Sequence, residues 1–254
     1  MGEKPLLSII TPSYNQGAFI EKTILSVLMQ DYSDLEYIVV DGGSTDDTIE
    51  ILKKYSNRIK WVSEPDRGQA DAVNKGFKMA KGEILGWINS DDTYNPGALN
   101  TVVGHFSKNP EIVMVYGDAY FIDRDGNNKG KYPTEQFSLK RLADTCFICQ
   151  PTVFMRAEVF NEIGMLDTNL HTCLDYDYWI RIGRHYPEKM IADLTGVYLA
   201  NSRMYDENKT IRMRREFFKE IMKTQKKYFG KPSKVSIRGY IKEIIIGMRF
   251  KMGK

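Results

Sequence analysis

The 254-residue chain has a formal net charge of +3, with 42% hydrophobic and 27% charged residues, which is close to the average for folded domains. This composition excludes general disorder, and the length suits one α/β core with an extension. No apolar run approaches the roughly 18 residues of a membrane-spanning helix, so we predict that the chain does not cross a membrane by itself.

The first 110 residues alternate between apolar runs and amphipathic segments. Four apolar runs predict buried strands, and each is followed by a turn and a helical pattern. The predicted strands cover 6–11, 36–41, 59–64 and 83–89, and the predicted helices cover 20–28, 46–55, 69–80 and 97–107. Ser44 and Asp47 are spaced like a capping box before the second helix. Four successive strand–helix units predict an α/β fold with a mostly parallel sheet flanked by helices.

After residue 110 the alternation becomes irregular. The sequence predicts a hairpin from 112–123 and 129–132, a short helix near 138–144, a strand at 152–156, and helices near 157–163 and from about Asp175. No linker rich in Pro, Gly or Ser divides the chain, so we predict one globular domain over residues 1–204.

The chain contains three cysteines, Cys146, Cys149 and Cys173. This odd number and the absence of a secretory signal at the start predict a reducing, cytoplasmic compartment without disulfides. Cys146 and Cys149 have the spacing of half a zinc site, but no second pair follows, so we expect buried thiols.

The C-terminal extension, residues 205–254, is basic. From Arg203 to Lys254 the chain carries 16 Lys or Arg and five acidic residues, a net charge of +11 that leaves −8 for residues 1–202. No helix-turn-helix, zinc-finger or RNP pattern accompanies this charge, so we do not expect nucleic acid as a partner.

Two helical patterns make up this extension. Residues 206–228 predict a strongly charged helix, and residues 237–250 predict an amphipathic, basic helix. A helix of the second kind suits the surface of an anionic membrane, which would place the chain peripherally on its inner face. Alternatively, its apolar stripe packs on the acidic globule or on a second subunit.

Acidic residues follow two of the predicted strands. Asp41 ends the second strand, and Asp91 with Asp92 follows the fourth. The carboxyl ends of parallel strands share the edge of the sheet at which such folds bind ligands. Because magnesium is usually held by one or two carboxylates plus substrate phosphates, we predict a divalent cation beside a nucleoside diphosphate. The alternative is a solvated Asx turn.

Three stretches of the sequence have a family resemblance. They are SIITPSYNQGAFIEKTILSVLMQDYSDLEYIVVDGGSTDDT, GEILGWINSDD and LDYDYWIRI. In this order, over roughly residues 5 to 200, they resemble the inverting family-2 glycosyltransferases with the GT-A fold, of the bacterial surface-polysaccharide type. The resemblance implies a catalytic domain with a nucleotide-binding half at about 1–110 and an acceptor-side half at about 111–204.

The resemblance also implies residues that hold the nucleotide. Thr11, Pro12 and Tyr14 would pack around the base, and Asp41 would hydrogen-bond the nucleoside. Many relatives carry Arg before Asn in the third loop, where this chain has Val73 and Asn74, so Arg67 and Gln69 are the substitutes that we expect to reach the donor. Many relatives also carry an acid at the position of Gly42, so a base contact there is not expected.

The same resemblance implies the metal and the base. The DxD element falls on Asn89, Ser90 and Asp91. Asp91 would coordinate Mn²⁺ or Mg²⁺, Asp92 would support the metal through water, and Asn89 or Ser90 would reach the ribose. Asn89 replaces the first carboxylate of the element, which implies a weaker metal site.

The catalytic base falls on Asp175, with Asp177 as the second candidate. Asp175 also begins a predicted helix, where a carboxylate is favoured by the helix dipole. His171 could line the acceptor pocket, although a lone histidine is more often structural. Residues 149–164 resemble an acceptor-side segment, and no role follows for Arg156.

The resulting prediction is a metal-dependent inverting enzyme that moves one sugar from a nucleotide-sugar donor, first of all a UDP-sugar, to a hydroxyl of a glycan or lipid-linked acceptor. The Gln-x-x-Arg-Trp motif of processive synthases is missing, which implies one sugar per event. A nucleotidyltransferase is the first alternative, although the loop TPSYNQG has no Lys or Arg for a triphosphate. A non-catalytic nucleotide- or sugar-binding protein is the second.

Overall fold

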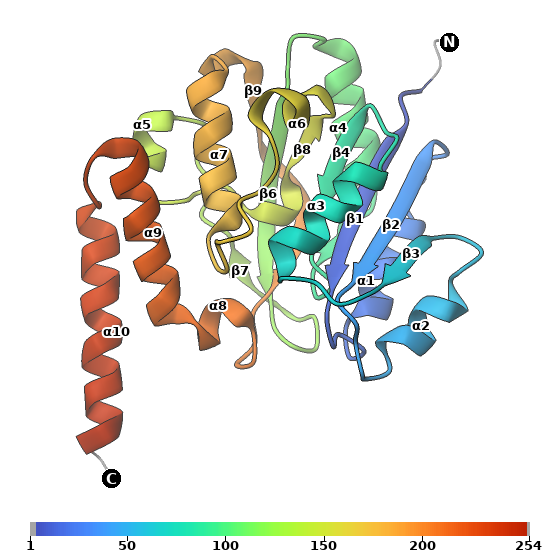
Figure 1. The fold of residues 1–254 in the computed structure, drawn as a ribbon. Helices are drawn as coiled ribbons and strands as arrows, with labels where there is room; N and C mark the ends of the chain where they lie inside the picture. Colours follow the sequence, from blue (N-terminus) through green and yellow to red (C-terminus); the bar gives the residue numbers. More distant parts are fainter. Residues whose placement is uncertain (1–3, 253–254) are drawn as a thin grey trace.

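The computed structural model describes residues 4–252, and side chains through residue 246. Within these residues a nine-stranded sheet is flanked by helices on both faces (Figure 1). The strands are β1 (Leu7–Ser13), β2 (Leu35–Asp41), β3 (Lys60–Ser63), β4 (Ile84–Trp87), β5 (Thr93–Tyr94), β6 (Met114–Ile122), β7 (Asn128–Lys131), β8 (Phe154–Arg156) and β9 (Ile191–Arg203). The helices are α1 (Ile20–Leu28), α2 (Thr48–Lys54), α3 (Gln69–Met79), α4 (Ala98–Lys108), α5 (Leu139–Leu142), α6 (Glu158–Ile163), α7 (Leu174–His185), α8 (Lys209–Arg212), α9 (Arg214–Phe229) and α10 (Lys234–Met252), with 3-10 turns at Gln150–Thr152 and Glu188–Met190.

The first half of the sheet is parallel, as predicted. β3, β2, β1 and β4 are neighbours in that order, and each adjacent pair runs in the same direction. All seven residues of β1 are buried, and none of them is charged, because a strand covered on both faces has no solvated face. The carboxyl ends of β1, β2 and β4 therefore meet at one edge of the sheet, the lower edge in Figure 1.

The second half of the sheet is mixed. β8 lies antiparallel between β4 and β6, and β6 pairs in parallel with β9. The strand β9 was not predicted, because residues 195–197 at its centre are exposed and the chain lacks a regular apolar pattern there. Register shifts beside Asp118 accommodate this irregular pairing.

Two local predictions were wrong. Ser44 does not cap α2; its hydroxyl donates to Asp41 instead, and Asp46 Oδ1 accepts the backbone N–H of Thr48 at 3.0 Å. The charged helix predicted over 206–228 is two helices, α8 and α9, which are separated at Met213.

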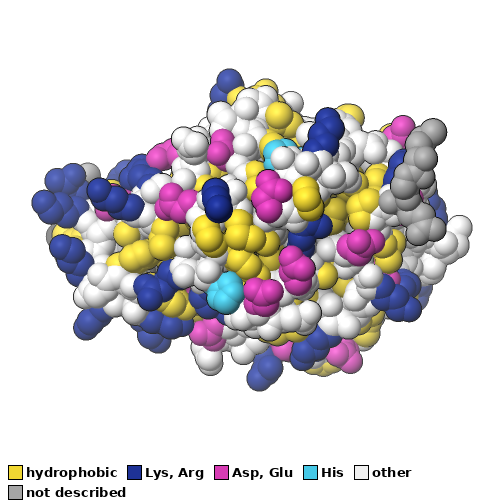
Figure 2. Space-filling model, turned by 90° about the horizontal axis from the view of Figure 1, so that it is seen from above, with side chains coloured by type: hydrophobic (Ala, Val, Ile, Leu, Met, Phe, Trp, Pro, Cys, Tyr) yellow, Lys and Arg dark blue, Asp and Glu magenta, His cyan; other side chains and the backbone are white. Residues whose placement is uncertain are grey.

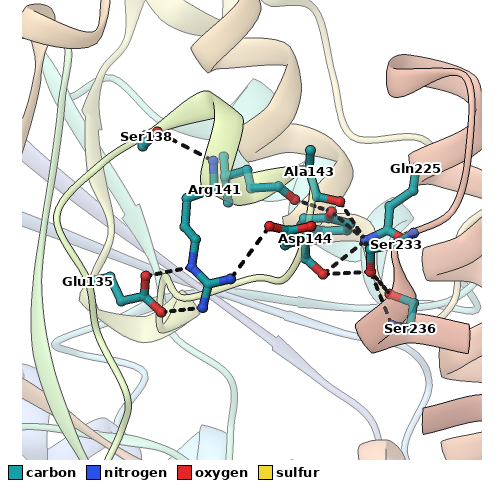
Figure 3. A network of polar contacts seen from close by, with 10 residues as sticks. Glu135, Ser138, Arg141, Ala143, Asp144, Gln225, Ser233 and Ser236 are labelled. Atoms are coloured by element: carbon teal, nitrogen blue, oxygen red, sulfur yellow. Dashed lines mark hydrogen bonds and ion pairs between the residues drawn. The ribbon is translucent and has the colours of Figure 1, made fainter. Parts of the chain in front are cut away.

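The C-terminal helices are bonded to the main globule through a buried polar network (Figure 3). Gln225 on α9 is fully buried; its amide nitrogen donates to the carbonyls of Ala143 and Asp144 at 3.1 and 3.3 Å. Its amide oxygen accepts the backbone N–H of Ser233 at 2.9 Å, and the Ser233 hydroxyl donates to Asp144 O at 2.8 Å. Because these groups are buried and paired, the turn between α9 and α10 is held in place.

Beyond this turn, α10 packs along α9 and projects past the lower edge of the fold (Figure 1). Within residues 4–252, no helix combines the length and apolar character that crossing a bilayer requires.

Candidate active site

A cavity of about 680 Å³ lies at the edge where β1 and β4 end. This volume is in the range of small-molecule sites. Its walls come from six segments that are distant in sequence. They are the end of β1 with the loop after it, the start of α3, the end of β4 with the loop after it, the 3-10 turn at Gln150, the start of α7 with the loop before it, and the end of β9 with the chain that follows. These segments contribute Pro12, Ser13, Tyr14, Gln16, Gln69, Trp87, Asn89, Ser90, Asp91, Asp92, Gln150, His171, Thr172, Leu174, Asp175, Ser202, Arg203, Tyr205, Asn208 and Lys209.

Asp91 and Asp92 lie together on the wall of this cavity. Burial raises the pKa of Asp91, and burial together with the charge of Asp91 raises the pKa of Asp92 well above its usual value. Asp92 Oδ1 accepts the backbone N–H of Arg203 at 2.8 Å, so this carboxylate ties β9 to the loop after β4. Neither carboxylate forms an ion pair with a described Lys, Arg or His within 4.0 Å. The charge of Arg203 lowers the pKa of both carboxyls, but burial outweighs it, so a bound cation would favour their charged forms.

The residues around Asp91 fit a metal that is shared with a ligand. Asp91 Oδ2 accepts hydrogen bonds from the Tyr205 hydroxyl at 3.1 Å and the Asn208 amide at 3.5 Å. The described residues contain no group of three or more His, Cys, Asp or Glu that could cage an ion. Asn89 Oδ1 accepts from the Gln69 amide at 2.7 Å, so the oxygen at the first DxD position is engaged as well. One carboxylate completed by substrate phosphates suits magnesium or manganese better than a protein cage does.

Asp41 does not line the cavity. It is fully buried, and its oxygens accept from the backbone N–H groups of Gly43 and Ser44 and from the hydroxyls of Ser44 and Ser63. The carboxylate thus closes the turn after β2. The prediction that Asp41 and Asp91 converge on one cation is therefore not met, although both residues lie at the same edge of the sheet.

Two further predicted donor contacts also lie elsewhere. The Arg67 side chain is 76% exposed and pairs with Asp71 at 3.3 Å, while Thr11 Oγ1 is buried against the Tyr37 hydroxyl at 3.0 Å. Pro12, Tyr14 and Gln69 do line the cavity, and the Tyr14 side chain is exposed at its rim. Of the three predicted base contacts, Pro12 and Tyr14 therefore line the cavity, and the Thr11 hydroxyl bonds Tyr37.

Asp175 lies in the first turn of α7 and faces the same cavity. Its desolvation raises the pKa to about 6, although the backbone N–H of Tyr176 donates to Oδ1 at 2.8 Å. A carboxylate that titrates near neutrality can accept a proton and still be ionised at the start of a reaction. Asp175 therefore has the position and the environment of a general base.

Asp177, the second candidate for the base, lies outside the cavity. It is 1% exposed and forms ion pairs with Arg181 at 2.9 Å and Lys227 at 3.4 Å. The Tyr228 hydroxyl donates to the same carboxylate at 2.8 Å. These contacts make Asp177 a link between α7 and α9, so its position does not support a role as the base.

The end of β9 and the chain after it contribute site residues that the sequence did not indicate. Arg203 is buried; its guanidinium donates to the carbonyls of Asp91 at 2.7 Å and of Asp123 and Arg124 at 2.9 Å. Lys209 reaches the cavity from α8, and its pKa is lowered by desolvation. The only sequence signal here was a change to strongly charged composition, which does not reveal a cavity wall.

Unpaired polar atoms are concentrated at this cavity. Among the described residues, eight buried side-chain nitrogen or oxygen atoms have no hydrogen-bond partner. Four of them belong to residues that line the cavity, namely Ser13, Gln16, Trp87 and Gln150. Since buried polar groups are normally paired, this pattern is typical of a site for a polar ligand.

Comparisons with known proteins agree with this geometry. The sequence model of the family described as "Glycosyl transferase family 2" matches residues 8–164. A chondroitin synthase of Escherichia coli is 31% identical over 193 residues, which cover 74% of this chain but only 28% of the synthase. This chain thus spans less than a third of the length of that relative.

Two solved structures have a similar fold. Staphylococcus aureus TarS 1–349, in complex with UDP-GlcNAc, has a TM-score of 0.68 at 19% identity, over 86% of this chain and 65% of that one. The mannosyltransferase PcManGT of Pyrobaculum calidifontis, in complex with GDP-Man and Mn²⁺, has a TM-score of 0.64 at 18% identity, over 87% of this chain and 62% of that one. The sheet and its flanking helices match the GT-A arrangement of these neighbours.

Proposed function

This chain belongs to glycosyltransferase family 2, and we propose that it transfers a single sugar from a nucleotide-sugar donor, with inversion, to a hydroxyl of a glycan or lipid-linked acceptor. The observation that carries this proposal is the placement of Asp91 and Asp175 in one cavity. The first residue suits a metal-bound diphosphate, and the second suits a proton acceptor.

Asp175 would remove the proton from the acceptor hydroxyl. The oxygen of that hydroxyl attacks the anomeric carbon while the bond from this carbon to the diphosphate oxygen breaks. Attack from the face opposite the diphosphate inverts the configuration. The raised pKa of Asp175, about 6, gives the carboxylate enough basicity for this step near neutral pH.

Asp91 would hold a divalent ion, Mn²⁺ or Mg²⁺, which when bound neutralises the charge of the departing diphosphate. Asn89 and Ser90 lie beside it and face the ribose in this proposal, whereas Pro12 and Tyr14 flank the base. Asp92 lies on the same wall and accepts the backbone N–H of Arg203, which positions the loop that carries Asp91. We propose a UDP-sugar as the first donor to test; the two similar structures are complexes with UDP-GlcNAc and with GDP-Man.

We also propose that α10 contacts an anionic membrane, which would bring the cavity near a lipid-linked acceptor. Ile237, Ile241 and Ile245 follow one another at helical spacing and are 38%, 49% and 42% exposed. The helix packs on α9 through another face, where a Cβ on Gly239 would lie 2.2 Å from Phe218. Within the described residues, the isoleucine row is therefore not part of the interface between α10 and the globule.

The charge around this row favours a membrane over a second protein copy. Figure 2 shows Lys and Arg side chains gathered at the end of the molecule formed by α9 and α10. Cations beside an exposed apolar row complement anionic headgroups above acyl chains, whereas two copies of the same basic helix would repel each other. The side chains of 247–250, the last part of the predicted 237–250 segment, lie outside the described residues.

The function is tested by comparing Asp175→Asn with the unaltered protein. We expect UDP with Mn²⁺ to raise the melting temperature of both, because ligands that bind only the native state stabilise it. Only the unaltered protein should release UDP from a UDP-sugar in the presence of an acceptor. Asp34→Asn, at an exposed carboxylate next to Ser33, serves as the matched control.

Three outcomes would contradict the proposal. Release of pyrophosphate from a nucleoside triphosphate would identify a nucleotidyltransferase. Nucleotide binding without turnover of UDP- or GDP-sugars would identify a binding protein. Full activity of Asp175→Asn would exclude this residue as the base.

A further inference from the structure

Gln150 has an unusual position in the cavity. It is the first residue of the 3-10 turn Gln150–Thr152, just before β8, and it is 9% exposed while lining the cavity. It belongs to the segment 149–164, to which the proposed mechanism assigns no role. A buried amide at a ligand cavity needs partners for both its nitrogen and its oxygen.

The orientation of the Gln150 amide is fixed by the backbone. Its Nε2 donates to the carbonyl of Trp87 at 2.8 Å. Because a carbonyl oxygen can only accept, the nitrogen must face Trp87, and the two ends of the amide cannot be exchanged. The other end, Oε1, is buried and has no hydrogen-bond partner in the described part of the chain. The group that completes this site must therefore be a hydrogen-bond donor.

The surroundings of Gln150 indicate which molecule supplies this hydrogen-bond donor. Trp87 is the last residue of β4, directly before the loop that carries Asp91. Its ring stacks on Trp179, with 5.5 Å between centroids, and Trp179 lies one helical turn after Asp175 on α7. Gln150 thus lines the cavity whose walls also include the segment that would hold the diphosphate and the segment that would supply the base. In an inverting transfer, the sugar being transferred occupies this space.

We propose that Gln150 binds the transferred sugar: its Oε1 accepts a hydrogen bond from a hydroxyl or an amide N–H of the donor sugar. This inference rests on the proposed function and adds a residue that selects the sugar. A buried acceptor left unpaired by the wrong sugar is a strong source of discrimination, stronger than a change of one methylene group in an apolar pocket.

Gln150→Met tests the inference, because methionine keeps the length of the side chain and removes both hydrogen-bonding groups. We expect the variant to bind UDP with Mn²⁺ like the unaltered protein, but to lose the additional affinity that the sugar confers. We expect kcat/KM to fall about tenfold to hundredfold for the donor that the unaltered protein uses. Preserved UDP binding also shows that the variant is folded.

Deoxy donors identify the contact directly. The parent UDP-sugar is compared with its 2-, 3-, 4- and 6-deoxy forms, or with the form lacking an acetamido group. For the unaltered protein, kcat/KM should fall by the same tenfold to hundredfold factor with one of these deoxy donors. Gln150→Met should use that donor and the parent equally well, because the two changes remove the same interaction.

Thr152→Val is the matched control within the same turn. Thr152 Oγ1 donates to the Cys149 carbonyl at 2.8 Å, and the residue is buried outside the cavity lining. This variant should lose stability while it keeps the discrimination among deoxy donors, which separates a disturbed turn from a lost sugar contact.

The inference is overturned if Gln150→Met discriminates among the donors as the unaltered protein does. It is also overturned if no deoxy donor is used worse than the parent, a measurement that needs no variant. If the unaltered protein binds neither UDP nor GDP with Mn²⁺, the proposed function fails first and this inference falls with it.

Discussion

Asp175, the proposed base, lies in an environment that opposes its charge. Since burial raises its pKa to about 6, the fraction of ionised base should rise between about pH 5 and pH 7. We expect kcat/KM to increase with pH over this interval, with half of its plateau near pH 6. A pH profile measured with saturating Mn²⁺ tests this, and a flat profile down to pH 5 would exclude Asp175 as the titrating base.

The same shift in pKa predicts an effect on stability. The folded pKa lies above the unfolded value of 3.8, so the native state binds this proton more tightly, and the unfolding free energy should fall as the pH rises from about 4 to 6. Asp175→Asn removes this penalty, and we expect it to be more stable than the unaltered protein by about 1–2 kcal/mol at pH 7.5. Urea unfolding at pH 7.5 and pH 4 tests this. The gain should shrink at the lower pH.

Asp41 has a structural role that its position at a strand end concealed. It closes the turn after β2 through four hydrogen bonds from three residues. Asp41→Ala should leave buried donors unpaired and lower the unfolding free energy by about 2–4 kcal/mol. Denaturant unfolding measures this loss. If the variant is equally stable but binds UDP more weakly, the structural role is wrong and Asp41 contacts the nucleoside, as the family resemblance implied.

These residues mark the limit of prediction from sequence at a single position. Asp91 and Asp175 could be placed from the order of family motifs, because each directly follows or begins an element with a clear pattern. Asp41 could not be distinguished from them, since its hydrogen-bond partners depend on the course of the turn. Gln150 was out of reach, because its role comes from a contact with Trp87, 63 residues away.

At the scale of elements, α3 packs closely on β1, and both elements contribute residues to the cavity wall. A Cβ on Gly76 would lie 2.4 Å from Cγ2 of Ile10, a core residue of β1. Gly76→Ala gains about 1 kcal/mol of helix propensity but forces the two elements apart. Because overpacking costs about 1–3 kcal/mol and disturbs neighbouring elements, we expect a net loss of stability and weaker nucleotide binding near Gln69.

Gly104 provides the matched control for this substitution. It lies in the interior of α4, and apart from the backbone of its own helix and its chain neighbours no atom lies within 4 Å of its hypothetical Cβ. Gly104→Ala should therefore stabilise the protein by about 0.5–1 kcal/mol. Thermal unfolding of both variants measures the contrast. If both glycines respond alike, the contact between α3 and β1 is not what Gly76 serves.

The elements differ in how far the sequence specified them. The parallel strands and their helices carry apolar runs or apolar residues at helical spacing. They could therefore be predicted, with errors of a few residues at their ends. β9 could not, because it is exposed in the middle and gains its hydrogen bonds from β6, more than 70 residues earlier in the chain. The chain that leaves β9 forms one wall of the cavity, so missing this strand also hid Arg203, Tyr205 and Lys209.

At the scale of the whole molecule, the negative and the positive net charge lie in different parts of the chain. The globule is acidic and holds the cavity, while the basic extension is anchored to it by Gln225 and Ser233 (Figure 3). Because α10 projects past the edge of the sheet at which the cavity lies, a membrane along this helix would lie beside the cavity (Figure 1). The anchor would then fix the orientation of the catalytic domain relative to the lipid.

This arrangement predicts binding to vesicles that contain phosphatidylglycerol, but not to phosphatidylcholine alone. Ile241→Ser with Ile245→Ser should weaken co-sedimentation by about tenfold or more, because two apolar side chains no longer enter the headgroup region. High salt should weaken it as well, by screening the Lys and Arg side chains. Val197→Ser, at an apolar residue of β9 that is 37% exposed, should have no effect. If the unaltered protein fails to bind anionic vesicles at low salt, the isoleucine row serves another contact, and a dimer detected at the same concentration would identify it as a second copy.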